Sequence, residues 1–283
     1  MTRGLAVVVV NYNAGDYLPR CLGSVFASSG DLSLDVVVVD NGSRDGSAAS
    51  AVAAHPRARL IENRSNFGFA AAANIGIRAT EAPYVLLLNP DAEIVSGTLA
   101  SLVKVADDRP DAGAVGPLVR NPDRTIQPSA RRVPRTFEAL MHAFLGPVAP
   151  GNTWTRAYTL ADWDRTTERE VEWISGSAML LRRRALHDVG VFDERYFMYV
   201  EDVDLCTRLR RSRWTVLFSP ELEVIHEIGV SARGQPRRMA REHSRSIYRY
   251  FSKHRARGPA VLLKPFVRGA LALRTELVSR GRR

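Results

Sequence analysis

The chain has 283 residues, 45% hydrophobic and 25% charged, which is the composition of a folded globular protein with one large core or two modest ones. Its two cysteines, Cys21 and Cys206, are far apart and each lies in a helical pattern, so we exclude a disulfide-stapled secreted domain and expect a reducing, cytoplasmic setting. The apolar run at residues 5–10 is too short for a signal peptide or a membrane span, and no other stretch is long enough to cross a bilayer.

The net charge of +10 is concentrated at the C-terminal end of the chain. Residues 231–283 contain 15 Lys and Arg against Glu242 and Glu276, so this region carries +13 and residues 1–230 carry −3. This asymmetry predicts a folded domain over 1–230 and a basic tail over 231–283 that meet different partners.

The first 90 residues alternate between strand and helix patterns. Continuous, mainly β-branched runs at 5–10 and 34–39, and the apolar run at 84–88, predict strands buried on both faces. Helices are predicted from about Asp16, in the Ala-rich stretch after Asp45 and over 67–79, with a weak strand at 58–61. The alternation predicts an α/β fold with a mostly parallel central sheet and helices on both faces.

The second part of the chain is less regular. Between residues 121 and 172 we predict one helix, over 137–145. A strand follows at 173–181, interrupted at 175–177, and then a helix that ends near Arg211. Further strands are predicted near 215–218 and 223–226, and the tail reads as two basic helices broken near Gly258.

Polar residues follow each strong strand, at the edge of a parallel sheet where ligands bind. Asp40 could accept the ring N–H of a pyrimidine, or could form a turn that caps the next helix through Ser43 or Asp45. Similarly, the loop at 66–69 either presents a helix N-terminus to phosphate or is a plain turn. The other polar residues in these stretches are Asn11, Asn13, Asn41, Asn74 and Asn89.

Two further residues could hold a divalent cation. Asp91 directly follows the strand at 84–88, where its carboxylate could hold a cation against a diphosphate; the alternative is an N-cap after Pro90. His226 ends a later strand, although an isolated His is more often structural than a ligand.

Residues 192–205 contain five carboxylates and four aromatic rings. Within them, Glu201, Asp202 and Asp204 crowd the start of a helix, where like charges raise one another's pKa values. Complementing the helix dipole explains one carboxylate but not three. We therefore predict a functional site here, with Asp202 as a general base.

These motifs, in this order, resemble the inverting family-2 glycosyltransferases with the GT-A fold, over residues 5–229. The resemblance implies a nucleotide-sugar half at 1–120 and an acceptor and catalytic half at 121–230. It also implies Mg²⁺ or Mn²⁺ as cofactor, although Asn89 replaces the first Asp of the usual DxD motif and is a weaker ligand. The implied roles are catalysis by Asp202 with Glu201; donor binding by Asn11, Asn13, Asp40, Asn41, Asn66, Gly68, Asn74 and Asn89; acceptor binding by Trp173, Ser175, Gly176 and Arg131; and metal binding by Asp91 and His226.

Residues 127–131, 141–147, 173–177 and 192–205 resemble bacterial L-rhamnosyltransferases more closely. The resemblance implies transfer of rhamnose from dTDP-β-L-rhamnose to N-acetylglucosamine on a polyprenyl diphosphate, in an α-1,3 linkage. Another nucleotide sugar, such as one of N-acetylglucosamine or galactofuranose, stays open as an alternative.

The basic tail fits such a lipid acceptor. Arginines interleave with apolar residues over 262–278, as in a helix at an anionic membrane surface, so we expect peripheral attachment to the cytoplasmic face of the plasma membrane. A solvated surface or a homodimer contact are the alternatives. A different class of function is nucleic-acid binding, with Tyr248, Tyr250 and Phe251 stacking on bases. That function would leave the acidic cluster and Asp91 unexplained, so we expect no nucleic-acid partner.

Overall fold

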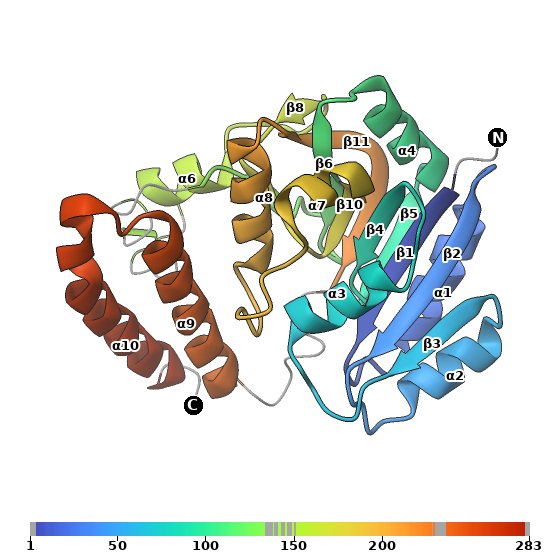
Figure 1. Ribbon diagram of the computed structural model, residues 1–283, viewed down its shortest axis with the longest axis horizontal. Coiled ribbons are helices and arrows are strands. Elements are labelled where there is room, and N and C mark those ends of the chain that lie inside the picture. Colours follow the sequence, from blue (N-terminus) through green and yellow to red (C-terminus); the bar gives the residue numbers. More distant parts are fainter. Residues whose placement is uncertain are drawn as a thin grey trace.

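The computed structural model describes residues 4–133, 138, 141, 142, 145, 149, 151–227, 229 and 236–280, with side chains undescribed at 236 and 277–280. Figure 1 shows a sheet with helices packed on it and a C-terminal pair of helices to one side. The predicted helix over 137–145 and the start of the tail at 231–235 lie largely outside the described residues.

A nine-stranded sheet in the described chain has the order β3-β2-β1-β4-β10-β6-β11-β5, with β8 paired to β11. Strands β1 to β4 run parallel, β10 runs against β4 and β6, and β11 runs with β6. The carboxyl ends of β1, β2, β4, β6 and β11 therefore share one edge with the start of β10. The strands are β1 (Gly4–Asn11), β2 (Ser33–Asp40), β3 (Ala58–Glu62), β4 (Tyr84–Leu88), β5 (Ala92–Ser96), β6 (Ala112–Arg120), β8 (Arg169–Glu170), β10 (Ala178–Arg182) and β11 (Thr215–His226).

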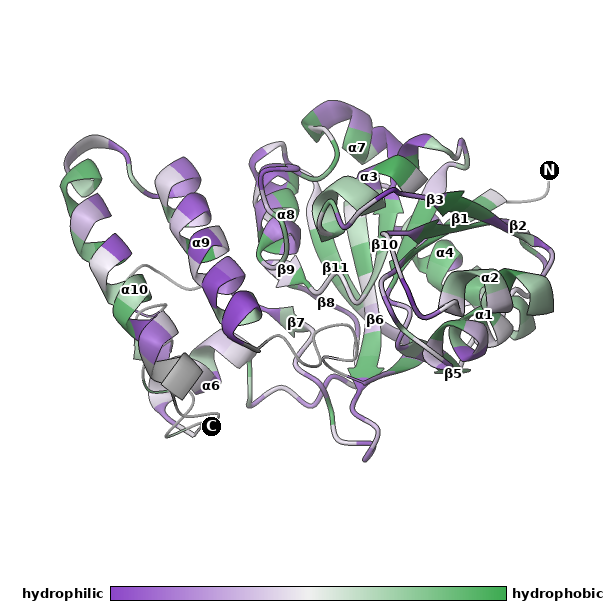
Figure 2. Cartoon of the chain, turned by 90° about the horizontal axis from the view of Figure 1, so that it is seen from below, coloured by the Kyte–Doolittle hydropathy of each residue, from purple (hydrophilic) through white to green (hydrophobic). Residues whose placement is uncertain are grey.

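The runs of apolar residues make the sheet the centre of two cores. In β1, Leu5, Val7 and Val9 pack into one core, whereas Ala6 and Val8 pack into the other, because neighbouring strand side chains point to opposite faces. The predicted α/β fold with covered faces is confirmed, and the hydropathy colouring shows the apolar strands (Figure 2). Helices α1 (Tyr17–Ala27), α2 (Ser47–Ala54) and α4 (Leu99–Asp108) cover the first face, and α3 (Phe69–Arg78), α7 (Arg183–Val189) and α8 (Glu201–Arg211) cover the second.

Short elements connect the sheet to the site. The predicted strand at 173–181 is two strands, β9 (Trp173–Ile174) and β10, separated at 175–177 as the polar residues there indicated. β9 pairs with β7 (Ala130–Arg131), and α6 (Thr153–Thr159) packs nearby. The two strands predicted after α8 are one long strand, β11, with a register shift between Phe218 and Glu223.

The tail is a hairpin of α9 (Pro236–His254) and α10 (Lys264–Arg280), joined by the 3₁₀ helix η1 (Gly258–Leu263). Two helices broken near Gly258 were predicted and are confirmed. The hairpin has a small core of its own, and none of the described helices is long and apolar enough to cross a membrane. The buried residues of this core are Phe251, Ala256, Val267 and Leu271.

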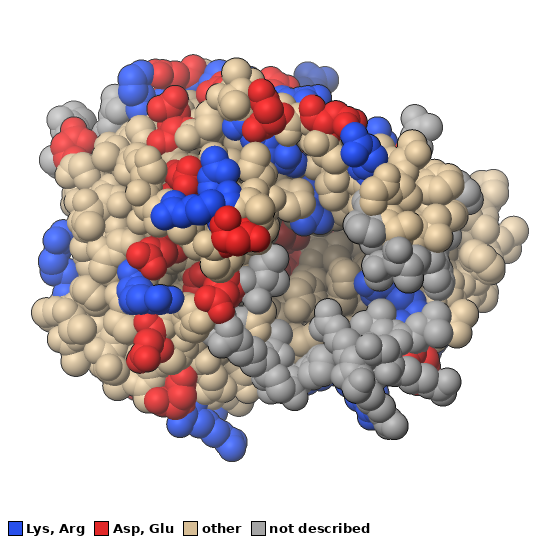
Figure 3. Space-filling model, turned by 180° about the vertical axis from the view of Figure 1, so that it is seen from behind, with Lys and Arg blue, Asp and Glu red and all other residues tan. Residues whose placement is uncertain are grey.

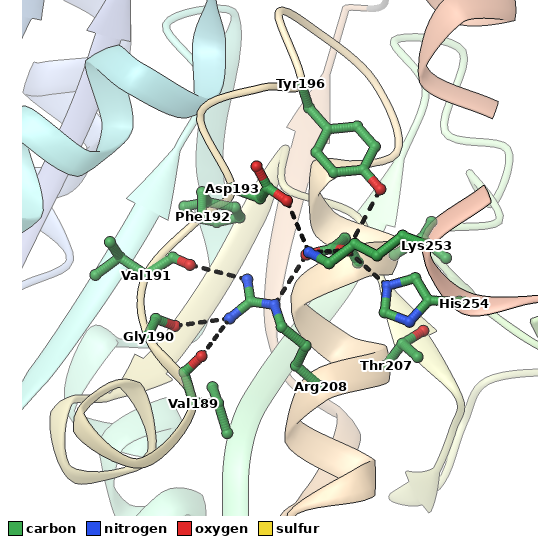
Figure 4. A network of polar contacts seen from close by, with 12 residues as sticks. Val189, Gly190, Val191, Phe192, Asp193, Tyr196, Thr207, Arg208, Lys253 and His254 are labelled. Atoms are coloured by element: carbon green, nitrogen blue, oxygen red, sulfur yellow. Dashed lines mark hydrogen bonds and ion pairs between the residues drawn. The ribbon is translucent and has the colours of Figure 1, made fainter. Parts of the chain in front are cut away.

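A buried ion cluster holds α9 against α8 (Figure 4). Asp204 of α8 is fully buried and accepts hydrogen bonds from Lys253 and His254 of α9. Arg208, one turn further along α8, donates to the same carboxylate at 2.8 Å. The hydroxyl of Tyr196 lies 3.3 Å from it. The tail is therefore docked on α8 through its charged residues.

Candidate active site

The first two residues of α8 form the acidic part of the site. The preceding residues, Tyr199 and Val200, have φ of 68° and 69°, a left-handed conformation that costs of order 1–3 kcal/mol for each non-glycine residue. The loop is held from the other side, because Phe69 donates its N–H to the carbonyl of Phe197 at 2.7 Å. Gly68 is required there, since its φ is 89° and a Cβ would collide with that same carbonyl oxygen. The backbone at Tyr199 and Val200 is therefore strained, and this conformation sets the direction in which α8 begins.

Glu201 and Asp202 have different surroundings. Asp202 is partly buried and accepts N–H bonds from Gly176 at 3.0 Å and Val203 at 2.8 Å. Burial raises the pKa of Asp202, and these N–H groups together with the charge of Arg131 offset part of the increase. Glu201 is buried, and its Oε2 has no hydrogen-bond partner among the described residues. Burial and the charge of Asp202 raise the pKa of Glu201 well above the ordinary range. The pKa of Glu201 is therefore raised with less to offset it than that of Asp202, which makes Asp202 the carboxyl of the pair that loses its proton more readily.

Asp204 corrects one step of the sequence analysis. The crowding of three carboxylates pointed to a shared functional role, but Asp204 faces the tail, is paired with Arg208 and Lys253, and accepts a hydrogen bond from His254. Its charge is explained by docking of the hairpin, and Glu201 and Asp202 are the two carboxylates of the cluster that line the cavity.

A second polar group forms where β4 and β11 end. Nε2 of His226 lies 3.3 Å from Oδ1 of Asp91 and 3.1 Å from Nδ2 of Asn89. Nδ1 of the same ring lies 2.9 Å from Oε1 of Gln127, which as an acceptor requires the proton on Nδ1. The lone pair of Nε2 consequently faces Asp91 and Asn89.

The positions of Asp91 and His226 fit two protein ligands of a divalent cation. Oδ1 of Asp91 is buried without a hydrogen-bond partner among the described residues, and the orientation of His226 by Gln127 is the usual support for a metal-ligating imidazole. No group of three or more His, Cys, Asp or Glu suited to a metal occurs in the described chain. A cation held by Asp91 and His226 would need its other ligands from substrate and water.

One cavity of about 580 Å³ joins the two groups. Its lining includes Glu201, Asp202, Asn89 and His226, so the predicted base shares one space with the imidazole of the predicted metal site, while Asp91 lies beside that imidazole outside the lining. The space-filling view from behind shows a hollow with charged side chains near it (Figure 3). Polar residues that are far apart in the sequence thus lie around one cavity, as expected from their positions at the ends of strands.

Comparison with known proteins identifies the family. Residues 6–190 match the family described as glycosyl transferase family 2, which is more than half of the chain. The chain belongs to that family. It is an enzyme of the glycosyltransferase class with the GT-A fold, as the sequence motifs predicted.

Relatives cover nearly the whole chain. N-acetylglucosaminyl-diphospho-decaprenol L-rhamnosyltransferase of Mycobacterium tuberculosis is 38% identical over 291 aligned positions, covering 99% of this chain and 94% of the relative. Rhamnosyltransferase WbbL of Escherichia coli K12 is 25% identical, covering 88% and 93%. Among solved structures, mannosyltransferase PcManGT of Pyrobaculum calidifontis, in complex with GDP-Man and Mn²⁺, aligns with a TM-score of 0.60 and 19% identity, covering 98% of this chain and 75% of that one.

Side-chain hydrogen bonds join the carboxyl ends of β1 and β2. Asn11 donates to Asp40 at 2.7 Å and to Ser47 at 2.9 Å, and Asp40 also accepts from the backbone and hydroxyl of Ser43. The turn expected as the alternative for Asp40 is therefore present. Asn13 accepts from the N–H of Arg44 at 2.8 Å, which fixes the neighbouring loop. Base binding by these residues stays a prediction.

Asn41 and Asn66 shape the loop before α3. Asn41 donates to Oδ1 of Asn66 at 3.0 Å and to the carbonyl of Gly68 at 3.1 Å, and it accepts from the N–H of Phe67. Their amides therefore hold Gly68 in place. Asn41 is only 2% exposed and also accepts from Asn63. Both N–H groups and both lone pairs of its amide are therefore engaged, and a contact with the donor from this loop would come from the partly exposed Asn66.

Asn74 is not accessible from the cavity. It is fully buried, and its amide donates to the carbonyl of Phe192 and to Glu194 and accepts from the N–H of Phe192. With both amide atoms used, the side chain clamps the segment that leads to α8. Its expected contact with the donor is replaced by this positioning role.

The residues predicted for the acceptor all line the cavity. They are Trp173, Ser175, Gly176 and Arg131. Trp173 is buried and donates its indole N–H to the carbonyl of Arg132 at 3.0 Å, so it is both a core anchor and part of the wall. Gly176 holds Asp202 through its N–H.

The sequence analysis missed the contribution of the tail. Eight residues of α9 and α10, or between these helices, line the same cavity, whereas the tail was expected to be a separate unit. The amphipathic pattern of the tail was visible in the sequence, but its partner was not. The residues are His243, Ile247, Tyr250, Phe251, Arg255, Val267, Leu271 and Arg274.

Proposed function

We propose that this chain transfers L-rhamnose from dTDP-β-L-rhamnose to the 3-hydroxyl of N-acetylglucosamine on a polyprenyl diphosphate, with inversion at the anomeric carbon. The observation that carries the transfer reaction is the single cavity shared by Asp202, Asn89 and His226. The choice of sugar and acceptor is supported by the 38% identity with the mycobacterial rhamnosyltransferase over almost the full length of both chains.

Asp202 acts as the general base in this proposal. Its carboxylate takes the proton of the acceptor hydroxyl as the hydroxyl oxygen bonds to the anomeric carbon. The bond from that carbon to the diphosphate oxygen breaks on the opposite face, and its electron pair leaves with dTDP. The N–H groups of Gly176 and Val203 hold the carboxylate in place, and the raised pKa of Glu201 favours its neutral form beside that carboxylate.

The donor would lie along the carboxyl ends of β1, β2 and β4. We assign recognition of the nucleotide to Asn11, Asn13 and Asp40, with Asn41, Asn66 and Gly68 shaping the loop. Asp91 and His226 would hold Mg²⁺ or Mn²⁺, with Asn89 beside them, and the cation would neutralise the charge on the leaving diphosphate.

The outer face of the hairpin supports attachment to an anionic membrane. Leu262 is 83% exposed and Phe266 is 67% exposed. Five of the seven exposed large apolar residues in the described chain lie within 261–273, next to Lys264 and Arg268. We assign this surface, Val261, Leu262, Leu263, Phe266 and Leu273, to peripheral attachment at the cytoplasmic face of the plasma membrane.

The nucleic-acid alternative is weakened by the packing of the tail aromatics. The hydroxyl of Tyr250 lies 2.8 Å from that of Thr207, and Phe251 is only 5% exposed. Tyr248 packs against the core of the hairpin. These rings are engaged within the protein, so they are not presented as a stacking platform.

Thermal-shift titration with dTDP, UDP and GDP, with and without Mn²⁺, tests the donor. We expect dTDP to stabilise the protein most, and more strongly with the cation. Transfer from dTDP-β-L-rhamnose to a short-chain prenyl-diphospho-N-acetylglucosamine, with the product anomer read by NMR, tests the reaction. Preference for UDP, or a product with retained configuration, would overturn the proposal.

Liposome co-sedimentation at low salt tests the membrane contact. Leu262→Ser with Phe266→Ser should reduce binding to anionic vesicles, whereas Val95→Ser, an exposed apolar residue of β5, should not. If the double variant still binds vesicles but changes from dimer to monomer in solution, the surface is a homodimer contact.

A further inference from the structure

Two arginines that line the cavity have no carboxylate partner among the described residues. Arg131 of β7 lies with its guanidinium 5.1 Å from the ring centroids of both Tyr158 and Trp173, and it donates to the hydroxyl of Tyr158. Arg274 of α10 lies with Nη2 3.5 Å from Nδ1 of His243. Its Nε is buried and has no hydrogen-bond partner in the described chain. Cations taken out of water are ordinarily paired, so these two guanidinium groups suit an anionic ligand.

The two arginines face the same space. His142 and His243 lie there as well, since the ring of His142 is 4.6 Å from that of Tyr158 and His243 contacts Arg274. Burial lowers the pKa of His243 to about 4, and the charges of both arginines add to this effect. Burial and the same two charges lower the pKa of His142. At neutral pH the group is therefore two fixed positive charges with two neutral imidazoles.

The arginine pair connects the base to an apolar wall. Arg131 is close enough for its charge to lower the pKa of Asp202, and Arg274 lies one helical turn from Leu271. Four apolar side chains of α9 and α10 line the cavity as well, and α10 also carries the exposed Phe266 and Leu273. The apolar side chains that line the cavity here are Ile247, Phe251, Val267 and Leu271.

We propose that Arg131 and Arg274 bind the diphosphate of the lipid acceptor, and that the apolar wall of the hairpin holds the first isoprene units. This inference rests on the proposed function. An acceptor of that class carries its diphosphate on the same sugar ring whose hydroxyl is deprotonated, so its diphosphate must lie one ring away from Asp202. Guanidinium groups bind phosphate oxygens through paired N–H bonds, and the isoprenoid requires an apolar surface that leads to the membrane.

The diphosphate of the donor is the other possible occupant. The donor diphosphate is assigned to the cation site at Asp91 and His226, so the two sources can be separated by filling the donor site first. Farnesyl diphosphate is a suitable probe, because it has the diphosphate and the isoprene units but no nucleotide.

The decisive experiment is calorimetric titration of farnesyl diphosphate into protein saturated with dTDP and Mn²⁺. Arg274→Gln should weaken binding by about 10–100-fold, the worth of a charged hydrogen bond. Arg274→Lys should retain much of the affinity. Arg241→Gln removes the same charge from an exposed position of α9 outside the cavity lining and is the matched control. Affinity for dTDP, titrated separately, should be equal in all four proteins.

Folding and turnover supply independent measurements. Because Arg274 is an unpaired, partly buried charge, Arg274→Gln should leave the melting temperature of the free protein equal or higher. With farnesyl-diphospho-N-acetylglucosamine as acceptor its KM should rise by the same factor, whereas KM for octyl N-acetylglucosaminide, which lacks the diphosphate, should not change.

Unchanged affinity of Arg274→Gln for farnesyl diphosphate would overturn the inference, even if rhamnosyl transfer is found. Weaker binding of dTDP in that variant would assign the arginines to the donor and would also overturn it. If instead the protein shows no rhamnosyl transfer, the proposed function fails, while the farnesyl diphosphate titration still decides whether these arginines bind a prenyl diphosphate.

Discussion

Nε2 of His254 lies 2.6 Å from Oδ1 of Asp204, a buried contact that joins the last turn of α9 to the first turn of α8. Asp204 follows the proposed base, Asp202, by two residues in the same helix. The position of the base and the docking of the hairpin therefore depend on one rigid element. The tail also lines the same cavity as Asp202.

Asp204→Asn should lower the free energy of unfolding by about 3–5 kcal/mol, because it leaves Lys253 and Arg208 without their shared buried counter-charge. Urea denaturation measures the change. Asp108→Asn breaks an exposed ion pair with Lys104 on α4 and should cost less than about 1 kcal/mol. Equal effects of the two substitutions would show that the cluster does not hold the hairpin.

The same cluster predicts a pH dependence of stability. Burial alone would raise the pKa of Asp204, but hydrogen bonds from His254 and Lys253 and the charge of Arg208 outweigh it and lower the pKa to about 2. An Asp in an unfolded chain has a pKa of about 3.9. The stabilisation is therefore complete above pH ~4 and is lost as the pH falls toward ~2. The free energy of unfolding should therefore change less with pH across this range in Asp204→Asn than in the wild type. An equal change in both proteins would contradict the assignment.

Asp202→Asn should lower kcat by about 10²–10⁴-fold while dTDP still binds, because the amide cannot accept the proton. Glu201→Gln is the matched comparison. Since burial raises the pKa of Glu201 and so favours its neutral form, the isosteric amide should retain most of kcat. Single-turnover rates with saturating donor and acceptor measure both. If Glu201→Gln were the more damaged variant, the base would have to be reassigned to Glu201.

The acid limb of the kcat profile reports the pKa of the base. Burial raises the pKa of Asp202, so activity should fall, as the pH decreases, at a higher pH than for an ordinary Asp. Arg131 lowers this pKa, and Arg131→Gln should therefore move the acid limb to higher pH. Arg131→Lys retains the charge and should bring the limb back. An identical limb in the Gln and wild-type enzymes would exclude this coupling.

Gln127 should tune metal affinity without being a ligand. Its Oε1 accepts from Nδ1 of His226 and so orients Nε2 toward Asp91. Gln127→Ala should raise the Mn²⁺ concentration needed for half-maximal activity by about 10–100-fold, as loss of such a support does in other metal sites. Removing the cation with EDTA should abolish transfer in both proteins. If Mn²⁺ titrations of the variant and wild type coincide, the imidazole is not part of a metal site.

Local sequence determined the frame of this protein. The β-branched runs of β1 and β2 and the apolar run of β4 specify strands because their apolar side chains occur on both faces, and the polar residues that follow them mark the edge where the site forms. The break at 175–177 and the two tail helices were predicted for the same local reason. The sequence analysis did not predict β5, α4 and β6, which lie between Asp91 and Asn121 and were passed over.

Tertiary structure alone decided which polar groups are available to a ligand. Asp204 and Asp202 are indistinguishable in the sequence, yet Asp204 is neutralised by residues fifty positions later and Asp202 opens onto the cavity. Asn74 was predicted to contact the donor, but its amide is hydrogen-bonded to the backbone of Phe192. The reason is physical: secondary structure follows from periodicity within about ten residues, whereas pairing and burial of a charged or amide group depend on partners that only the folded chain brings near.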